Sequence, residues 1–317
     1  MSTYPASALE AKPTEILKTK SSNQSRLKRR NALYGYLFIS PMMLGFLIFM
    51  AGPILAAFVL SLTDYSLLHP STFVGADNYA QVLTKDDLFW TSIKNTLYFS
   101  AGLIPLNLGL SLALAILLSA KLPGMGIFRT AIFTPVVTSI IVWAIVWKYV
   151  FATDAGLVNQ ILGFFGVTGP AWMYNTHLVM PVVILVSVLK KVGMNMVIFL
   201  AALQDVPKMY YEAATIDGAS KWKQFTKITL PMISPSLFLT LIITLIGSLK
   251  VFSQIVVMTD GGPGTSTNVL VYYIYKLAFK TFDLGYASAV AFILFFLVLA
   301  LTIVQWYFRK RWVHHEE

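Results

Sequence analysis

The chain has 317 residues, of which 57% are hydrophobic and only 12% charged, with a formal net charge of +10. An ordinary soluble domain carries about 25% charged residues, so this composition excludes that class. There is no cysteine, which excludes disulfide frameworks, thiolate metal sites and cysteine nucleophiles.

A polar segment, 1–31, comes first and contains seven Lys and Arg. It has no apolar region of its own, which argues against a cleaved signal peptide. Its richness in Ser, Lys and Pro predicts a disordered basic tail.

Apolar stretches follow along the rest of the chain, at about 36–61, 94–118, 127–150, 178–203, 232–257 and 287–308. Each reaches the roughly 20 apolar residues that a helix needs to cross a bilayer. They are continuous and rich in Leu and Ile rather than alternating, so helices are predicted and not barrel strands. The sequence therefore predicts an all-α integral membrane protein with six transmembrane helices in one domain, 32–310.

Basic residues are distributed unevenly between the two sides that these spans define. Sixteen of the 24 Lys and Arg lie in the first tail, the loops 119–129 and 204–231, and the segment after 308, against four in the alternate loops. Loops with an excess of Lys and Arg stay in the cytoplasm. We therefore predict a multi-pass protein of a bacterial inner membrane with both termini, including the tail 311–317, in the cytoplasm. The charge then reports topology and indicates no nucleic-acid partner.

Two segments between spans, 156–166 and 268–280, are apolar but too short to cross a bilayer. The second contains Lys276, Lys280 and three tyrosines, a mixture typical of a helix in the membrane interface. A helix packed among the loops would give the same pattern, and the sequence leaves both interpretations open.

The longest cytoplasmic loop, 204–231, has the signals of a helix, a break and a second helix. Asp205 and Pro207 suit the start of the first helix. Gly218 suits the left-handed position that ends it, and Ser220 can cap the second helix. So ordered a loop between two spans predicts a docking surface rather than a tether.

The same loop resembles a known motif. Glu212-Ala213-Ala214, three residues, Gly218, nine residues, Ile228, one residue and Leu230-Pro231 match the EAA signature of binding-protein-dependent importer permeases at every position. The resemblance implies the type I ABC importer fold, with a cytoplasmic coupling helix that sits in a cleft of a separate ATPase subunit. It makes Glu212 the main polar contact and Gly218 the pivot, with Ala213, Ala214 and Asp217 beside them. An ordinary amphipathic loop between helices is the alternative.

The resemblance covers nearly all of residues 33–310 and narrows to the sugar permeases typified by maltose importers. That branch is matched by Phe73-Val74-Gly75 with Asn78-Tyr79, by Met258-Thr259-Asp260-Gly261-Gly262-Pro263-Gly264, and by Phe282-Asp283-Leu284-Gly285-Tyr286-Ala287. It implies a subunit that forms the path for a sugar or oligosaccharide. The implied partners are a second homologous permease, a dimer of ATPase subunits, a periplasmic solute-binding protein and membrane lipid.

Energy conversion is expected outside this chain. The sequence has no GxxxxGK[ST] phosphate loop, and its four His residues lack the spacing of a metal site. We therefore expect a transporter subunit and not an enzyme, with no cofactor in this chain and with ATP and Mg on the partner ATPase.

Three lysines inside the predicted spans are functional candidates, because an intramembrane charge is expensive. Lys190 and Lys191 lie near the middle of the fourth span, and Lys250 lies in the fifth. Gly193 follows the pair, and a helix broken at that depth would line a water-filled cavity. Snorkelling, or pairing with the partner subunit, is the alternative.

In maltose-type permeases the sugar contacts lie on the third, fourth and fifth spans. Alignment through the EAA and GGP motifs places the matching positions here at Val136, Ile140, Lys190, Lys191, Met194, Thr244, Ser248 and Val251. The last three have the spacing of one helix face. The lysine pair departs from the small, apolar or aromatic residues usual for neutral sugars. The pair favours an anionic substrate, such as alginate fragments or glycerol phosphate. In this respect the chain resembles the permease subunits of alginate importers.

Two other functions are compatible with a multi-span chain. A secondary transporter driven by an ion gradient would need acidic or His relays in the membrane and would leave the EAA loop unexplained. A scaffolding membrane protein would leave both the loop and the lysines without a role.

Overall fold

The computed structural model describes residues 13–68, 70–120 and 123–312. Over these residues the regular structure is helical, with two isolated bridges. In this described part of the chain, four helices are long and apolar enough to cross a membrane, and two bent helix pairs bring the number to six if each pair is one span. The predicted all-α membrane fold is confirmed. The chain divides into two compact units, Met1–Val59 and Leu60–Glu317.

The first unit is one helical run made of α1 (Pro13–Phe46), the π-helical η1 (Leu47–Ala51) and most of α2 (Gly52–Ser61). The Gly52 N–H bonds the Leu47 carbonyl, five residues back. This wider turn precedes Pro53, which has no N–H to continue an α-helical ladder.

The tail predicted to be disordered is therefore helical from Pro13 onward, and residues 1–12 lie outside the described part. Between 14 and 34 there is no Gly or Pro, and many residues are straight-chain types with high helix propensity. Polarity alone predicts the absence of a core, but it does not stop a helix that continues an adjacent span.

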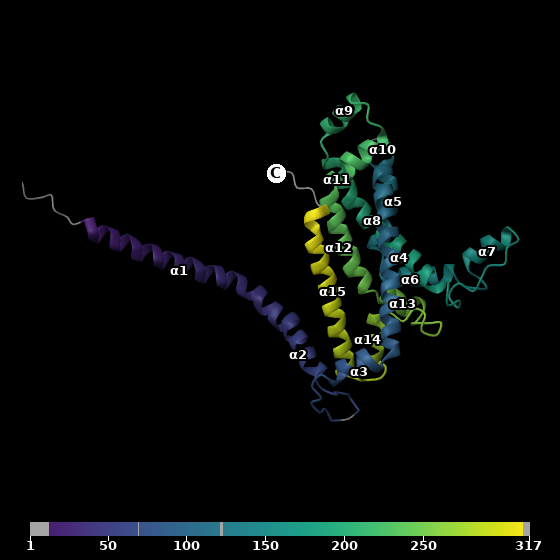
Figure 1. Cartoon of the computed structure of the whole chain (residues 1–317), viewed down its shortest axis with the longest axis horizontal. Coiled ribbons are helices and arrows are strands. Elements are labelled where there is room, and N and C mark those ends of the chain that lie inside the picture. The colour runs from purple at the N-terminus through teal and green to yellow at the C-terminus, as the bar shows by residue number, and fades with distance from the viewer. Residues whose placement is uncertain (1–12, 69, 121–122, 313–317) are drawn as a thin grey trace, which may run out of the picture. The chain divides into compact units, whose positions relative to one another are not determined.

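The second unit contains the remaining helices (Figure 1). They are α3 (Asp77–Lys85), α4 (Asp87–Leu118), α5 (Met125–Val137), α6 (Ile140–Val150), α7 (Leu157–Phe164), α8 (Val179–Asp205), α9 (Lys208–Ile216), α10 (Lys221–Gln224), the π-helical η2 (Phe225–Thr229), α11 (Leu230–Met232), α12 (Ser234–Leu249), α13 (Ser253–Met258), α14 (Leu270–Phe279) and α15 (Leu284–Trp312). α3 and α14 lie at one end of this unit, and α9 and α10 lie at the other (Figure 1).

α8 is the most buried of the long helices in the second unit. In its most apolar stretch of 18 residues, 67% of the residues are buried, against 28% in α4 and 17% in α15. Buried polar side chains join it to its neighbours. Asn195 on α8 donates to Asn107 on α4 and, at 3.0 Å, to Thr244 Oγ1 on α12. Asn107 in turn approaches the Val188 carbonyl of α8 at 3.4 Å. Such bonds hold helices together in lipid, where apolar surface alone gives no preference for helix over lipid contact.

Two of the predicted spans are not straight helices. The third, 127–150, breaks between α5 and α6, whose axes meet at 102°. The fifth, 232–257, is interrupted after Leu249, where α12 ends before α13 begins at Ser253, and α12 is bent by 67° from the helical run before it. Pro135 near the end of α5 and Pro235 in the first turn of α12 accompany these bends. Apolar composition predicts the length of a span but not the direction of its chain.

The two short apolar segments differ in how far their side chains are buried. In α14, the side chains of Leu270, Tyr272, Tyr273 and Ala278 are buried, so 268–280 contains a packed helix. In α7, by contrast, Leu157, Ile161 and Phe164 are exposed. An interfacial position for α7 therefore stays a prediction.

Candidate functional site

The loop 204–231 folds into two helices joined by a reversal. Gly218 has a φ of +73°, as the sequence predicts. The Ser220 hydroxyl accepts a hydrogen bond from the Lys223 N–H at 3.3 Å and caps α10. Asp205 does not cap α9, because α8 continues through it and Pro207 stands directly before α9.

Two polar side chains that sequence reasoning missed hold this loop together. Gln224, which is buried, donates to Thr215 Oγ1 at 3.0 Å and to the Ala219 carbonyl at 3.2 Å. The Tyr211 hydroxyl lies 2.9 Å from Thr229 Oγ1. These bonds join α9 to α10 and η2, so the loop is an ordered element. Gln224 stands among lysines in the sequence, which is the pattern of a solvated face and gives no signal of burial.

One face of α9 is apolar and is not covered by any described residue. Met209 and Ile216 are 67% and 87% exposed, and Ala213 between them is also exposed. Their i, i+4, i+7 spacing puts them on one helix face. Within the described residues, the neighbouring Glu212 carboxylate makes no hydrogen bond or ion pair. Of the predicted coupling residues, Glu212, Ala213, Asp217 and Gly218 are exposed, and Ala214 is half-buried.

Lys190 is buried, with 8% of its surface exposed. Its Nζ donates to the carbonyl oxygens of Pro135 and Thr138 and lies 3.4 Å from that of Val136. The centroid of the Trp143 ring is 6.0 Å away. These carbonyls belong to the last turn of α5 and to the break after it, so Lys190 faces a helix end and not open space.

Lys191 and Lys250 have fewer contacts. Lys191 is half-buried, and its Nζ lies 3.5 Å from the Gly247 carbonyl of α12. Lys250 is exposed directly after α12, and Met194 on α8 is 50% exposed. Among the described residues, no carboxylate forms an ion pair with either ammonium group.

Gly193 does not break the fourth span, contrary to expectation. α8 runs through it, and a Cβ there would collide with the Ile132 carbonyl oxygen of α5. The glycine therefore allows α5 and α8 to approach closely. The helix that breaks beside Lys190 is the third span, between α5 and α6.

The other predicted path positions fall into two groups. Thr244, Ser248 and Val251 are all buried, and Thr244 bonds Asn195 in the helix packing described above. Val136 and Ile140 are half-buried and flank the break between α5 and α6. The structure thus brings Val136 and Lys190 together at the break, with Ile140 at the start of α6. It buries Thr244 and Ser248 of α12, but Val251 follows the end of that helix at Leu249, so the three residues do not form the single helix face that their spacing predicted.

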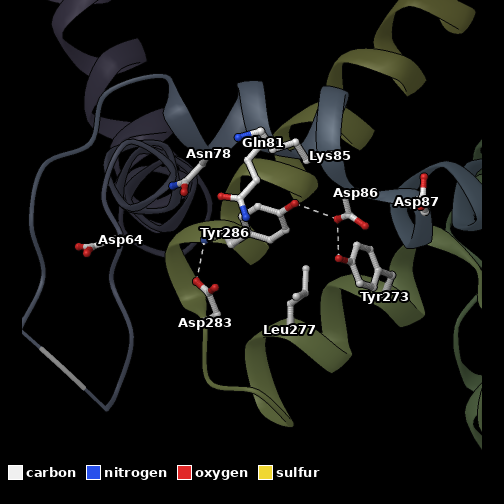
Figure 2. A pocket seen from close by; sticks show the side chains of 10 residues that line it. All are labelled: Asp64, Asn78, Gln81, Lys85, Asp86, Asp87, Tyr273, Leu277, Asp283 and Tyr286. Carbon is white, nitrogen blue, oxygen red and sulfur yellow. Dashed lines mark hydrogen bonds between the residues drawn. The ribbon is translucent and has the colours of Figure 1, made fainter.

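A polar pocket of about 610 Å³ at the α3–α14 end was not predicted (Figure 2). Asp86 accepts hydrogen bonds from the Phe89 N–H at 2.9 Å and from the Tyr273 and Tyr286 hydroxyls at 2.6 and 2.8 Å. Burial, together with the bond to Asp86, raises the pKa of Tyr273. These tyrosines lie 187 and 200 residues from Asp86 in the chain, so no local pattern could have indicated the cluster. The pocket is also lined by Asp64, Asn78, Gln81, Lys85, Asp87, Leu277 and Asp283.

Sequence comparisons place this geometry among known proteins. The family model for the inner membrane component of binding-protein-dependent transport systems matches residues 106–314. A lactose transport system permease protein of Rhizobium radiobacter is 35% identical, over 90% of this chain and 97% of its own length. A trehalose/maltose transport system permease protein of Thermococcus litoralis is 36% identical, over 88% of this chain and 95% of its own. These names confirm the expectation of a transporter subunit and not an enzyme.

A solved structure gives the corresponding likeness in three dimensions. It is that of a bacterial alginate ABC transporter in complex with a periplasmic protein bound to alginate pentasaccharide. One of its chains has a TM-score of 0.79 and 24% identity to this chain, over 90% of this chain and 96% of that one. At this identity the likeness concerns the fold, and it confirms the predicted type I architecture.

Proposed function

The chain belongs to the family of binding-protein-dependent transport system inner membrane components, and from that premise we propose that it is one transmembrane subunit of an ATP-driven importer for a sugar or oligosaccharide. The relatives named for lactose and for trehalose or maltose support the sugar class. The observation that carries the proposal is the ordered α9, which presents Glu212, without a partner among the described residues, beside an exposed apolar face. Family membership favours an importer over a transporter driven by an ion gradient.

In this proposal α9 docks on a separate ATPase subunit, which holds ATP and Mg. The face formed by Met209, Ala213 and Ile216 supplies apolar surface, at about 25 cal/mol per Å² buried. Glu212 supplies one charge for a basic group of the partner. Movement of α9 reaches α10 through Gln224 and then the membrane through α12. α9 and α10 would therefore move together as one rigid element.

The substrate class we propose is an anionic saccharide. Lys191 and Lys250 both lie near the end of α12, and neither has a described carboxylate partner. An ammonium group at the centre of a span costs about 2.5–3.5 kcal/mol on insertion scales. A carboxylate passing along the path would offset part of that cost. Maltose and lactose are neutral, so this proposal distinguishes the chain from the relatives named for those sugars.

The proposed assembly has further parts. A second homologous permease completes the path, two ATPase subunits drive it, a periplasmic solute-binding protein delivers the saccharide, and lipid surrounds the spans. Both termini lie in the cytoplasm, on the side of α9. The outer pocket at Asp86 then lies on the periplasmic side.

Reconstitution tests the proposal. The chain is co-expressed with the proposed second permease and ATPase subunits and reconstituted in proteoliposomes, and the binding protein is added. ATP hydrolysis is measured with lactose, with maltose and with an alginate oligosaccharide. We expect one saccharide to stimulate hydrolysis several-fold, only when the binding protein is present, and we expect it to be acidic. If no ATPase chain copurifies and no saccharide stimulates hydrolysis, the proposal is wrong.

A further inference from the structure

We infer that Lys190 is a positioning residue that latches the broken third span onto α8, and that only Lys191 of the adjacent pair acts on the charge of the substrate. The second half of this inference rests on the proposed function. The first half rests on contacts of Lys190 that involve no substrate. The sequence made both lysines candidates for the substrate path without deciding which of them faces it, and their contacts differ.

The first argument concerns the end of α5. A helix leaves its last four carbonyls without partners in the helix, and the bilayer core supplies no water to satisfy them. At this break the Thr138 hydroxyl donates to the Thr134 carbonyl at 3.2 Å. Lys190 serves the carbonyls of Pro135, Val136 and Thr138. An ammonium has three N–H donors, and a positive charge is favourable at a helix C-terminus. Lys190 therefore acts as the cap of a helix to which it does not belong.

The second argument concerns the surface of α8 that carries Lys190. Val186, Lys190 and Gly193 are spaced i, i+4, i+7 and share one face. The Trp143 indole N–H of α6 donates to the Val186 carbonyl at 3.0 Å. Gly193 lies against the Ile132 carbonyl of α5. One face of α8 thus contacts α6, the break and α5 in succession, and Lys190 is the middle contact.

The third argument is the contrast with Lys191. Successive residues of a helix point about 100° apart, so the two lysines face different neighbours. Lys191 is half-buried and has one long contact, at 3.5 Å, to the Gly247 carbonyl. Lys190 has three carbonyl neighbours and little exposed surface. A substrate carboxylate can therefore recruit Lys191 without disrupting the backbone, whereas recruiting Lys190 would uncap α5.

The latch has a consequence for the path. Val136 and Ile140, the predicted path positions on the third span, flank the break that Lys190 holds. Replacing Lys190 by Met removes the ammonium donors from the Val136 and Thr138 carbonyls, whereas the Pro135 carbonyl keeps the hydrogen bond that it accepts from the Thr138 N–H at 3.2 Å. The 102° angle between α5 and α6 would then be free to change. Replacing Lys191 by Met leaves the break as it is.

Distance measurement between spin labels tests the latch. The native chain has no cysteine, so T130C on α5 and Y149C on α6, both exposed positions, can be labelled cleanly in the full-length chain in nanodiscs. We expect a narrow distance distribution in the otherwise native chain and in K191M, a broadened or displaced one in K190M, and a return toward native in K190R. A K190M distribution as narrow and as centred as the native one would overturn the latch. If K190M does not fold, K190Q replaces it, because Gln keeps two donors but loses the positive charge, the third donor and one bond of length. A broadened distribution in K190Q then supports the latch, and a native one shows that the ammonium group does not hold the break and overturns it.

Transport by the reconstituted importer tests the division of roles. In K190M, uptake of an acidic and of a neutral saccharide should fall together, with their ratio unchanged and restored activity in K190R. In K191M the ratio should fall about tenfold, the change expected for one charge-assisted hydrogen bond. A ratio altered by K190M as much as by K191M would make Lys190 a substrate contact and overturn the inference. The spin-label result holds even if no saccharide is transported, so failure of the proposed function is recognised separately.

Discussion

Asp86 and Glu212 are carboxylates near opposite ends of the second unit, and their surroundings differ. Asp86 accepts three hydrogen bonds, two of them from buried tyrosines (Figure 2). Glu212 accepts none within the described residues, and the apolar side chains near it are exposed. A carboxylate whose partners come from its own chain stabilises that chain. One left unpaired on an exposed apolar face is positioned for another chain, and that contrast is the basis of the predictions that follow.

The largest effect is expected at the unpaired carboxylate. In E212K the partner's basic group would meet a like charge, so we expect transport to be abolished and the ATPase to dissociate more readily. D154K makes the same charge change at an exposed turn between α6 and α7 and serves as the matched control. Uptake and ATPase retention after purification are the two measurements. Normal values of both in E212K would remove Glu212 from the coupling contact.

A slightly smaller effect is expected at the turn beside it. Gly218 has a positive φ, and a Cβ there would meet nothing within 4 Å. A substitution therefore acts through the backbone alone, at about 1–2 kcal/mol for an ordinary residue in the left-handed region. G218V should lose most transport, whereas G218N should keep it, because Asn tolerates this conformation. Equal transport in the two variants would show that the reversal is not needed for coupling.

The internally satisfied carboxylate predicts a loss of stability instead. D86A removes the cap of α4 and leaves the Tyr273 and Tyr286 hydroxyls without their acceptor. We expect the free energy of unfolding to fall by about 2–4 kcal/mol. The exposed neighbour Asp87 gives a matched control, D87A, with a change within about 0.5 kcal/mol. Thermal unfolding in detergent measures both, and equal midpoints would contradict the structural role of Asp86.

The smallest functional effect is expected from probes of topology. Single cysteines at Ser71, Thr265, Arg30 and Lys223 replace exposed side chains and should leave transport unchanged. A membrane-impermeant thiol reagent added to intact cells should label the first two positions only. Labelling at Arg30 or Lys223 would contradict the cytoplasmic placement of the N-terminal helix and the coupling loop.

Local signals explain what could be predicted from the sequence. Six apolar stretches predicted the spans, and Gly218 and Ser220 predicted the reversal and the second cap of the loop, because each depends on residues close in the chain. The length of a span could be predicted from composition. The 102° break could not, since the apolar residues of α5 and α6 read as one continuous stretch.

Contacts between distant segments explain what could not be predicted. The Lys190 ammonium bonds carbonyls 52 to 55 residues away, and backbone carbonyls have no signature in a sequence. Its intramembrane position indicated a function but not which one. The same holds for Gln224, whose burial depends on how α9 folds back on α10.

The docking of α9 on an ATPase is the central claim, and cysteine cross-linking tests it most directly. A213C introduces one thiol on the exposed face of α9 in a chain that has no other cysteine. A short thiol-to-amine cross-linker, applied to membranes that contain the co-expressed importer, should join A213C to the ATPase subunit. The same reagent on T168C, an exposed position in the α7–α8 connection, should give no such product. A cross-link to the ATPase from T168C but not from A213C, or from neither, would contradict the account.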